Sequence, residues 1–280
     1  MECDKNTDFK NLINCLESIH KWCNGNFLKL NNDKTKIMAL SSKSYKSDKI
    51  SQLKIMGETI QVESSARNLG FVFDEYLTMS KQINQVCSQG YGMLRNLWKI
   101  SKKVTDVSLR TQLVHSGILS RVDYCNSLYV SLPKLQTNKL QKLINASARF
   151  ILNITGKDRF EHITPHLQKL HFLPINYRIK FKICLMSYKC IHNLAPSYLI
   201  ELINIRQPNW ERSYLRKDAD GLLLTHKNPS VQNYKNRSFS FTAPNYWNKI
   251  VIEIRQSPSV TLFKSKLKTE FYTEWVDGTI

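Results

Sequence analysis

The stretch WCNGNFLKLNNDKTKIMAL, residues 22–40, has the pattern of a helix end, a turn and a strand. Upstream of it, apolar residues recur at spacings of three and four, so they share one side of an amphipathic helix: Phe9, Leu12, Ile13, Leu16 and Ile19. We expect a helix over residues 8–23 whose apolar stripe, together with Trp22, packs in a core. Asn24-Gly25 offers the positive-φ position that ends a helix, and the alternation over residues 34–40 predicts a short strand.

Three more strands and four longer helices are predicted downstream. Residues 52–62 read as a hairpin around Gly57-Glu58, and a strand over 68–73 is expected to pair with it. From Leu77 the apolar period becomes helical, which predicts one helix of roughly 20 residues, and further helices follow over 104–119, from Pro133 to about 153, and over 177–191.

Specific motifs in this pattern resemble non-LTR retrotransposon reverse transcriptases. W-x3-N-x-LKLN-x2-KT at residues 22–35 resembles the segment after the catalytic aspartate turn of that family, and ARNLGFVFD at 66–74 resembles its "LG" hairpin strand. Further motifs of the thumb, connector and tail are DYCN at 123–126, L-x2-LPI-x2-R at 170–178, RSF at 237–239, APNYWN at 243–248, IR at 254–255 and FK-x2-LKT at 263–269. The resemblance therefore covers nearly the whole chain.

The resemblance implies an α+β fold, with a small antiparallel palm-remnant sheet and a helix, a mainly helical thumb and connector, and a helical tail. The corresponding regions are residues 1–76, the end of the palm; 77–203, the helical thumb and connector; and 204–280, a linker and small C-terminal region. Because 280 residues leave no room for fingers and the first half of a palm, we expect the C-terminal part of a longer polymerase.

Catalysis by such a polymerase requires aspartates that hold two metal ions, which activate the primer hydroxyl and steady the departing pyrophosphate. No adjacent Asp-Asp pair occurs in the sequence. By the resemblance, Lys34 corresponds to a palm lysine near the pyrophosphate, but it has no reaction to assist here. We expect an RNA-directed DNA polymerase fragment without nucleotidyl transfer, binding no cofactor, with Mg²⁺ needed only by the intact enzyme.

The charge of the chain favours a polyanionic partner. Forty-one basic residues against 22 acidic ones give a net charge of +19, and residues 101–200 alone carry 15 basic and 4 acidic residues. We expect binding to the backbone of RNA, DNA or an RNA/DNA hybrid. The candidate residues follow the first long helix or line one side of the helix after Pro133, opposite its apolar side: Lys102, Lys103, Lys139, Lys142 and Arg149.

The same features also fit alternatives that do not involve nucleic acid. The basic stripe is also what a solvated helix face looks like, and the whole chain could be a basic helical scaffold that binds proteins, with its charge serving solubility. The aromatics near Arg237 could stack on bases or pack a small subdomain, of which packing is the more frequent. No particular protein partner is predicted.

Metal sites and membrane segments are not expected. Cys184-x5-Cys190-x-His192 lacks zinc-knuckle spacing, and His162 and His166 are separated by Pro165 without the glutamate of a metalloprotease helix. The seven cysteines are odd in number and scattered, as in reduced intracellular proteins. We therefore expect an intracellular location, cytoplasmic or nuclear. We also expect no membrane segment.

Overall fold

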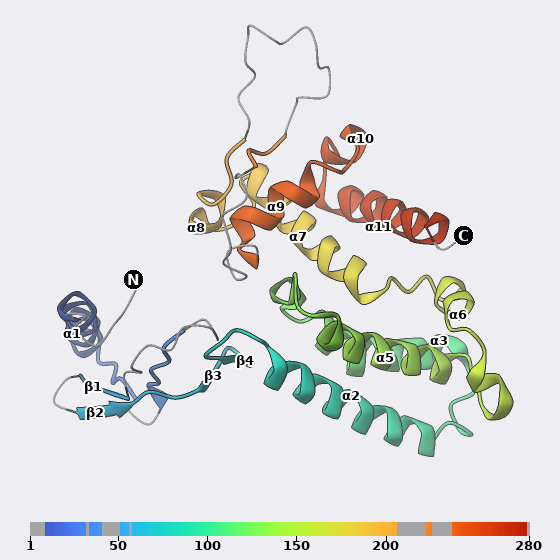
Figure 1. Cartoon of the computed structure of the whole chain (residues 1–280), viewed down its shortest axis with the longest axis horizontal. Helices are drawn as coiled ribbons and strands as arrows, with labels where there is room; N and C mark the ends of the chain where they lie inside the picture. Colours follow the sequence, from blue (N-terminus) through green and yellow to red (C-terminus); the bar gives the residue numbers. More distant parts are fainter. Residues whose placement is uncertain are drawn as a thin grey trace, which may run out of the picture. The chain divides into compact units, whose positions relative to one another are not determined.

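The computed structural model describes residues 9–31, 34–40, 51–55, 58–205, 222–225 and 237–278 (Figure 1). It is an α+β structure, as the sequence predicts, with many helices and two small antiparallel hairpins. The chain divides into two compact units, Met1–Gln82 and Ile83–Ile280. The first contains both hairpins and helix α1; the second is helical.

Helix α1, Lys10–Gly25, confirms the first predicted helix but ends differently from the prediction. Gly25 stays helical, and Asn26 caps the helix through a hydrogen bond from its Nδ2 to the carbonyl oxygen of Trp22, at 2.8 Å. The positive φ, 58°, belongs to Phe27, whose side chain is 99% exposed. The helix and its positive-φ turn therefore extend two residues further than the Asn-Gly pattern predicted.

The apolar stripe of α1 is largely exposed to solvent within the described residues. Cys23 is the one buried side chain of the helix, whereas Ile19 and Trp22 are 44% and 63% exposed. The prediction that this stripe and Trp22 pack in a core is therefore wrong for the described part of the chain. The periodicity gave the helix correctly, but a periodic stripe does not say what covers it.

Two separate hairpins replace the single sheet that the sequence predicted. Strands β1, Gln52–Ile55, and β2, Glu58–Gln61, pair with each other, and so do β3, Ser65–Asn68, and β4, Phe71–Asp74. Pairing of Ile55 with Glu58 leaves residues 56–57 as the connection, one position earlier than predicted; these two lie outside the described residues.

The expected strand over 68–73 is wrong because Leu69 and Gly70 form a turn in its middle. Their φ angles of 47° and 85° are those of a two-residue hairpin turn, in which the backbone twist matches that of the strands. The expected strand over 34–40 reduces to one parallel bridge between Ile37 and Val62.

The first half of the second unit is built on two long helices. Helix α2, Ser80–Lys99, has 20 residues, and α5, Lys134–Ile151, begins directly after Pro133; both predictions are confirmed. Between them lie α3, Val107–Val114, a π-helical turn His115–Leu119, α4, Ser120–Asp123, and the 3-10 turn Asn126–Tyr129, η3. Helix α3 begins at 107 rather than 104 because the Asp106 side chain accepts a hydrogen bond from the Leu109 amide, at 2.8 Å.

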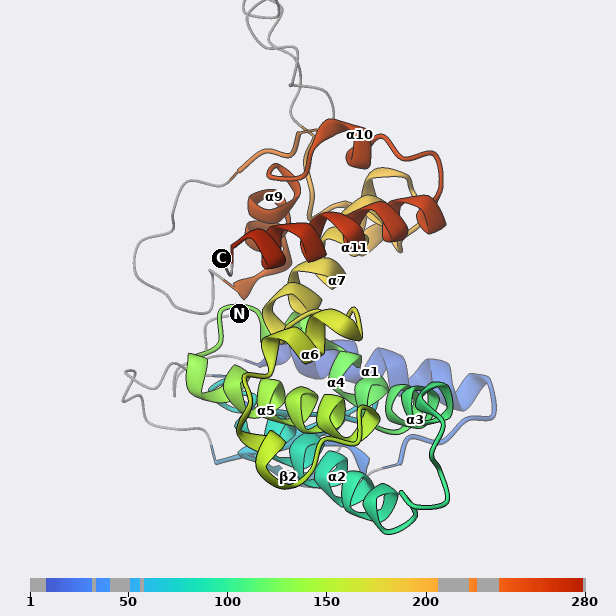
Figure 2. The ribbon, with the colours of Figure 1, turned by 90° about the vertical axis from the view of Figure 1, so that its right-hand side faces the viewer.

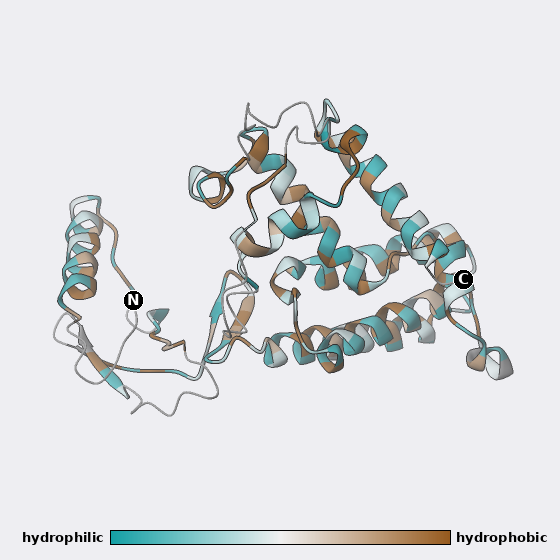
Figure 3. Cartoon of the chain, turned by 45° about the horizontal axis from the view of Figure 1, so that its top comes forward, coloured by the Kyte–Doolittle hydropathy of each residue, from teal (hydrophilic) through white to brown (hydrophobic). Residues whose placement is uncertain are grey.

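Helices α2 and α5 pack against each other with their chains running in the same direction. Asn84 lies beside Lys139, Gly90 beside Leu143, and Trp98 beside Phe150, whose ring centroids are 5.2 Å apart. A Cβ atom at Gly90 would lie only 2.5 Å from Cδ2 of Leu143, so this glycine permits the close approach. Figure 3 shows hydrophilic and hydrophobic residues alternating along these helices. This is the pattern of a helix with one face toward a core and the other toward solvent.

A buried arginine closes the end of this bundle. Arg110, only 3% exposed, donates hydrogen bonds to the carbonyl oxygens of Ser101, Val104 and Phe150, at 2.9, 2.7 and 3.1 Å. These bonds satisfy the buried guanidinium and fix the loop after α2 to the end of α5.

Helix α7, Ile175–Ile191, confirms the helix predicted over 177–191 (Figure 2). It contacts α5 and η3 on one side and α9 and α11 on the other. The other elements of this half are η4, Gly156–Phe160; α6, Thr164–Lys169; α8, Ser197–Ile200; α9, Phe239–Trp247; α10, Ile252–Arg255; and α11, Val260–Asp277.

The two glycines of α2 provide a matched pair for testing the packing of α2 on α5. Gly90→Val should lower the free energy of unfolding by about 1–3 kcal/mol, because the added atoms collide with buried Leu143. Gly92→Val should change it little, since nothing lies within 4 Å of a Cβ atom at Gly92. Urea unfolding followed by circular dichroism measures both; equal losses would contradict the described packing.

Candidate nucleic-acid interface

All five predicted nucleic-acid-binding residues lie in the second unit. Lys102 and Lys103 are exposed in the turn that directly follows α2, and Lys139, Lys142 and Arg149 project from α5. The predicted apolar side of α5 is confirmed, because its residues are all completely buried: Leu140, Leu143, Ile144, Ala148 and Ile151. Lys142 is exposed, while Lys139 and Arg149 are half-buried at the edges.

Helix α2 adds a second stripe that the sequence prediction missed. Tyr91, Arg95 and Lys99 follow one another at intervals of four residues and are exposed, with Asn84 and Ser88 exposed on the same side. The apolar period of this helix does not by itself reveal the stripe. The four-residue spacing of Arg95 and Lys99, opposite the buried positions, was the available signal.

The two stripes adjoin along the contact between α2 and α5. Lys139 Nζ donates a hydrogen bond to Asn84 Oδ1, at 2.8 Å, so a cation of α5 reaches the exposed side of α2. The parallel packing then places Arg149 toward the end of α2, from which the turn with Lys102 and Lys103 leaves. We call this surface the basic face and define it by seven cations: Arg95, Lys99, Lys102, Lys103, Lys139, Lys142 and Arg149.

No acidic residue occurs in the sequence segments that form the basic face. Residues 76–105 and 124–157 contain no Asp or Glu. A solvated helix commonly pairs opposite charges at spacings of three and four, and neither helix has such a pair. The positive charge is therefore not neutralised within these segments, and attraction of a polyanion is its direct electrostatic consequence.

Two ionisable groups at this surface remain neutral. Burial raises the pKa of the Cys87 thiol, with the nearby Lys139 ammonium acting in the opposite direction. Burial, and secondly Cys87, raise the pKa of the Tyr91 phenol. Both groups are thus uncharged at neutral pH and add no negative charge to the basic face.

Lys34 lies in the first unit and is exposed. Its backbone amide donates to Asn31, to the carbonyl oxygen at 3.2 Å and to Oδ1 at 3.1 Å. Nothing in this turn tests the role that the resemblance gives to Lys34, which stays a prediction.

Two motifs of the resemblance meet in one polar cluster. Asp123 of the DYCN motif forms an ion pair with Arg178 of the LPI-x2-R motif, with Oδ2 and Nη1 2.8 Å apart. Asn126 donates to the other carboxylate oxygen at 3.2 Å, and Arg178 Nε donates to the carbonyl oxygen of Leu173 at 2.8 Å. The cluster joins the turn after α4 to the start of α7, which gives these motif residues a structural role.

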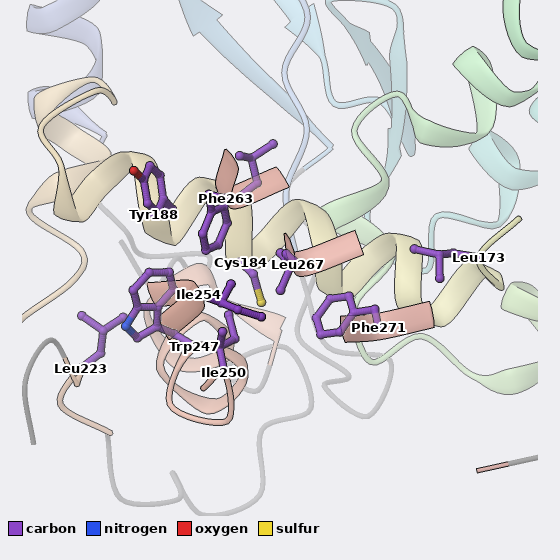
Figure 4. Close-up of a cluster of buried hydrophobic side chains, with 11 residues drawn as sticks. Leu173, Cys184, Tyr188, Leu223, Trp247, Ile250, Ile254, Phe263, Leu267 and Phe271 are labelled. Atoms are coloured by element: carbon purple, nitrogen blue, oxygen red, sulfur yellow. The ribbon is translucent and has the colours of Figure 1, made fainter. Parts of the chain in front are cut away.

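The tail aromatics belong to a core rather than to an exposed stacking platform. Trp247 is 1% exposed and stacks with Phe263, which in turn stacks on Tyr188, as Figure 4 shows. The Tyr188 hydroxyl donates to the carbonyl oxygen of Ser257, at 2.6 Å. Phe239, Phe241 and Tyr246 are half-buried with Trp247 on α9. Packing is therefore the better interpretation of this segment.

Other kinds of site receive no support from the described residues. None of their His, Cys, Asp and Glu side chains form a group of three or more that could hold a metal ion. His166 lies 3.3 Å from the Glu161 carboxylate. Among the helices that the structure describes, none combines the length and apolar character needed to cross a membrane.

Comparison with known proteins identifies no relative: no protein-family model, no curated protein and no solved structure matches the chain. The family resemblance therefore depends on the quoted motifs alone.

The polar cluster can be tested by a double-mutant cycle. Asp123→Ala should lower the free energy of unfolding by about 2 kcal/mol, because it leaves the largely buried Arg178 without its carboxylate. Adding Arg178→Met should cost less than the sum of the single changes, since both remove the same interaction. Strict additivity in urea unfolding would contradict the pairing.

Proposed function

We propose that the chain binds the phosphate backbone of RNA, DNA or an RNA/DNA hybrid through the basic face, as a non-catalytic piece of a non-LTR reverse transcriptase. The observation that carries this proposal is the pair of packed helices, α2 and α5, whose cations have no acidic residue in the same segments. Charge and geometry support it together, because five of the seven cations project from two helices in contact and the other two lie in the turn that follows α2.

The proposed mode of binding is electrostatic and independent of base sequence. Lysine and arginine side chains that neutralise phosphates release condensed counterions, and this release makes affinity fall steeply with salt. Over its ten-residue span from Lys139 to Arg149, α5 extends about 15 Å, so its cations meet successive phosphates along a strand. Such contacts hold and orient nucleic acid without reading its bases.

Nucleotidyl transfer is not part of the proposal. The reaction of this family uses aspartates to place two metal ions, and the sequence has no Asp-Asp pair. We expect binding without primer extension when the chain is assayed alone with a primed RNA template, deoxynucleotides and Mg²⁺. Extension would contradict this part of the proposal.

One observation favours a second function, binding of a protein partner. The first unit exposes several large apolar side chains: Leu12, Ile19, Trp22, Phe27, Leu28 and Leu40. Exposed apolar residues that gather in one unit are typical of interaction sites. This alternative uses a different unit from the basic face, so the two functions are separable by mutation.

The salt dependence of binding tests the proposal directly. The triple variant Arg95→Gln, Lys99→Gln, Lys142→Gln should bind an RNA/DNA hybrid more weakly, and the slope of log affinity against log salt should become shallower by about 2–3, reflecting three lost phosphate contacts. Fluorescence anisotropy over a salt titration measures both quantities.

The matched control removes the same charge elsewhere in the second unit. Lys264, Lys266 and Lys268 are exposed on α11, and changing all three to Gln should leave the slope nearly unchanged. An equal effect of the two triple variants would show that net charge alone, not the basic face, determines binding. Salt-insensitive binding of the unaltered chain would favour the scaffold alternative.

A further inference from the structure

One aromatic ring stands within the basic face. Tyr91 is 40% exposed on α2, between Asn84 and Arg95 in the exposed stripe. In the described part of the chain its ring stacks on no other aromatic side chain, and its hydroxyl makes no hydrogen bond. Trp98, further along the same helix, differs because it packs edge-on against Phe150.

The helix surface next to Tyr91 has one position without a side chain. The next residue, Gly92, has no side chain, and nothing lies within 4 Å of the position that a Cβ atom would take there. Ser88, one turn earlier, is small, and Arg95, one turn later, carries the nearest cation of the stripe. The stripe therefore places a half-exposed ring, open space and a guanidinium in one turn of helix.

We infer that Tyr91 is a stacking position for an unpaired base, so that the basic face takes single-stranded nucleic acid. This inference depends on the proposed function, because the phosphates must first be held by the cations. An aromatic ring stacks on any base regardless of sequence, and alternation of aromatic and basic side chains is how single-strand-binding grooves work. Arg95 adds a cation for the phosphate next to the stacked base.

The ring is suited to an unpaired base rather than to a duplex. In a duplex, both faces of each internal base are already stacked, so an exposed Tyr91 would have no base to contact and only the cations would bind. With an unpaired base, the ring and the cations act together. Burial raises the pKa of the phenol, so Tyr91 remains neutral and does not repel phosphate.

The test separates stacking from charge by comparing two ligands with equal numbers of phosphates. The first is a short oligouridylate, and the second is the same backbone with abasic positions. The full chain should bind the first more tightly than the second, and Tyr91→Ala should remove most of this preference, weakening oligouridylate binding roughly 5- to 150-fold. Tyr91→Phe should retain it, and the salt slope should be equal in all three proteins.

Two further variants exclude trivial explanations. Tyr198→Ala removes another exposed tyrosine, on α8, and should have no effect on either ligand. Gly92→Leu leaves Tyr91 in place but fills the space beside it, so it should weaken binding to the oligouridylate and not to the abasic strand. Because Gly92 faces open space, this change should not unfold the helix.

The possible failures are distinguishable. If Tyr91→Ala binds both ligands as the unaltered chain does, while the basic-face variant still loses its salt-dependent binding, the stacking inference is overturned and the proposed function stands. Tighter binding of an RNA/DNA hybrid than of the single strand, with no effect of Tyr91→Ala, would overturn it in the same way. Absence of salt-sensitive binding to any of these ligands would overturn both.

Discussion

The contact between α2 and α5 is the one on which the basic face depends. Because Gly90 has no side chain, Leu143 can approach the backbone of α2. Nearer the C-terminal ends of both helices, the ring of Trp98 packs edge-on against the ring of Phe150. This contact forms a core from the apolar sides of both helices and simultaneously brings their polar sides next to each other. The basic face is thus a consequence of the packing, since it combines cations from both helices.

Polar side chains attach other elements of the unit to one another. Arg110 fixes the loop after α2 to the last turn of α5 through three carbonyl oxygens, and the Asp123–Arg178 pair fixes the turn after α4 to α7. On α7, Tyr188 stacks on Phe263 of α11, which in turn stacks on Trp247 of α9. Polar groups inside this unit serve mainly to join elements, whereas the positive charge of the basic face lies at the surface of α2 and α5.

Much of the helical structure could be predicted from the sequence, because a helix needs only local periodicity and a start signal. The bounds of α5 follow from Pro133, and α2 follows from its apolar stripe. The hairpins were harder to predict from the sequence, because strand pairing depends on which strands are neighbours. The Leu69-Gly70 turn divides a segment whose sequence pattern predicts one strand. The exposure of Trp22 could not be predicted from the sequence either, because amphipathic periodicity identifies the apolar face of a helix but not what packs against it.

The candidate site was predictable in part for the same reason. Lys139, Lys142 and Arg149 could be placed on one side of α5 from their spacing, but their alignment with Arg95 and Lys99 depends on the packing of two helices distant in sequence. In the sequence, nothing distinguishes Tyr91 from the other aromatic residues. Only its exposure and the empty space beside Gly92 distinguish it.

Lysine footprinting by chemical modification and mass spectrometry, with and without a saturating single-stranded RNA, would test the central claim most directly. The account predicts that Lys99, Lys102, Lys103 and Lys142 become protected, while the exposed lysines of α11, Lys264 and Lys266, react equally in both samples. Protection confined to α11, or no protection on α2 and α5 despite binding, would contradict the assignment of the basic face as the nucleic-acid interface.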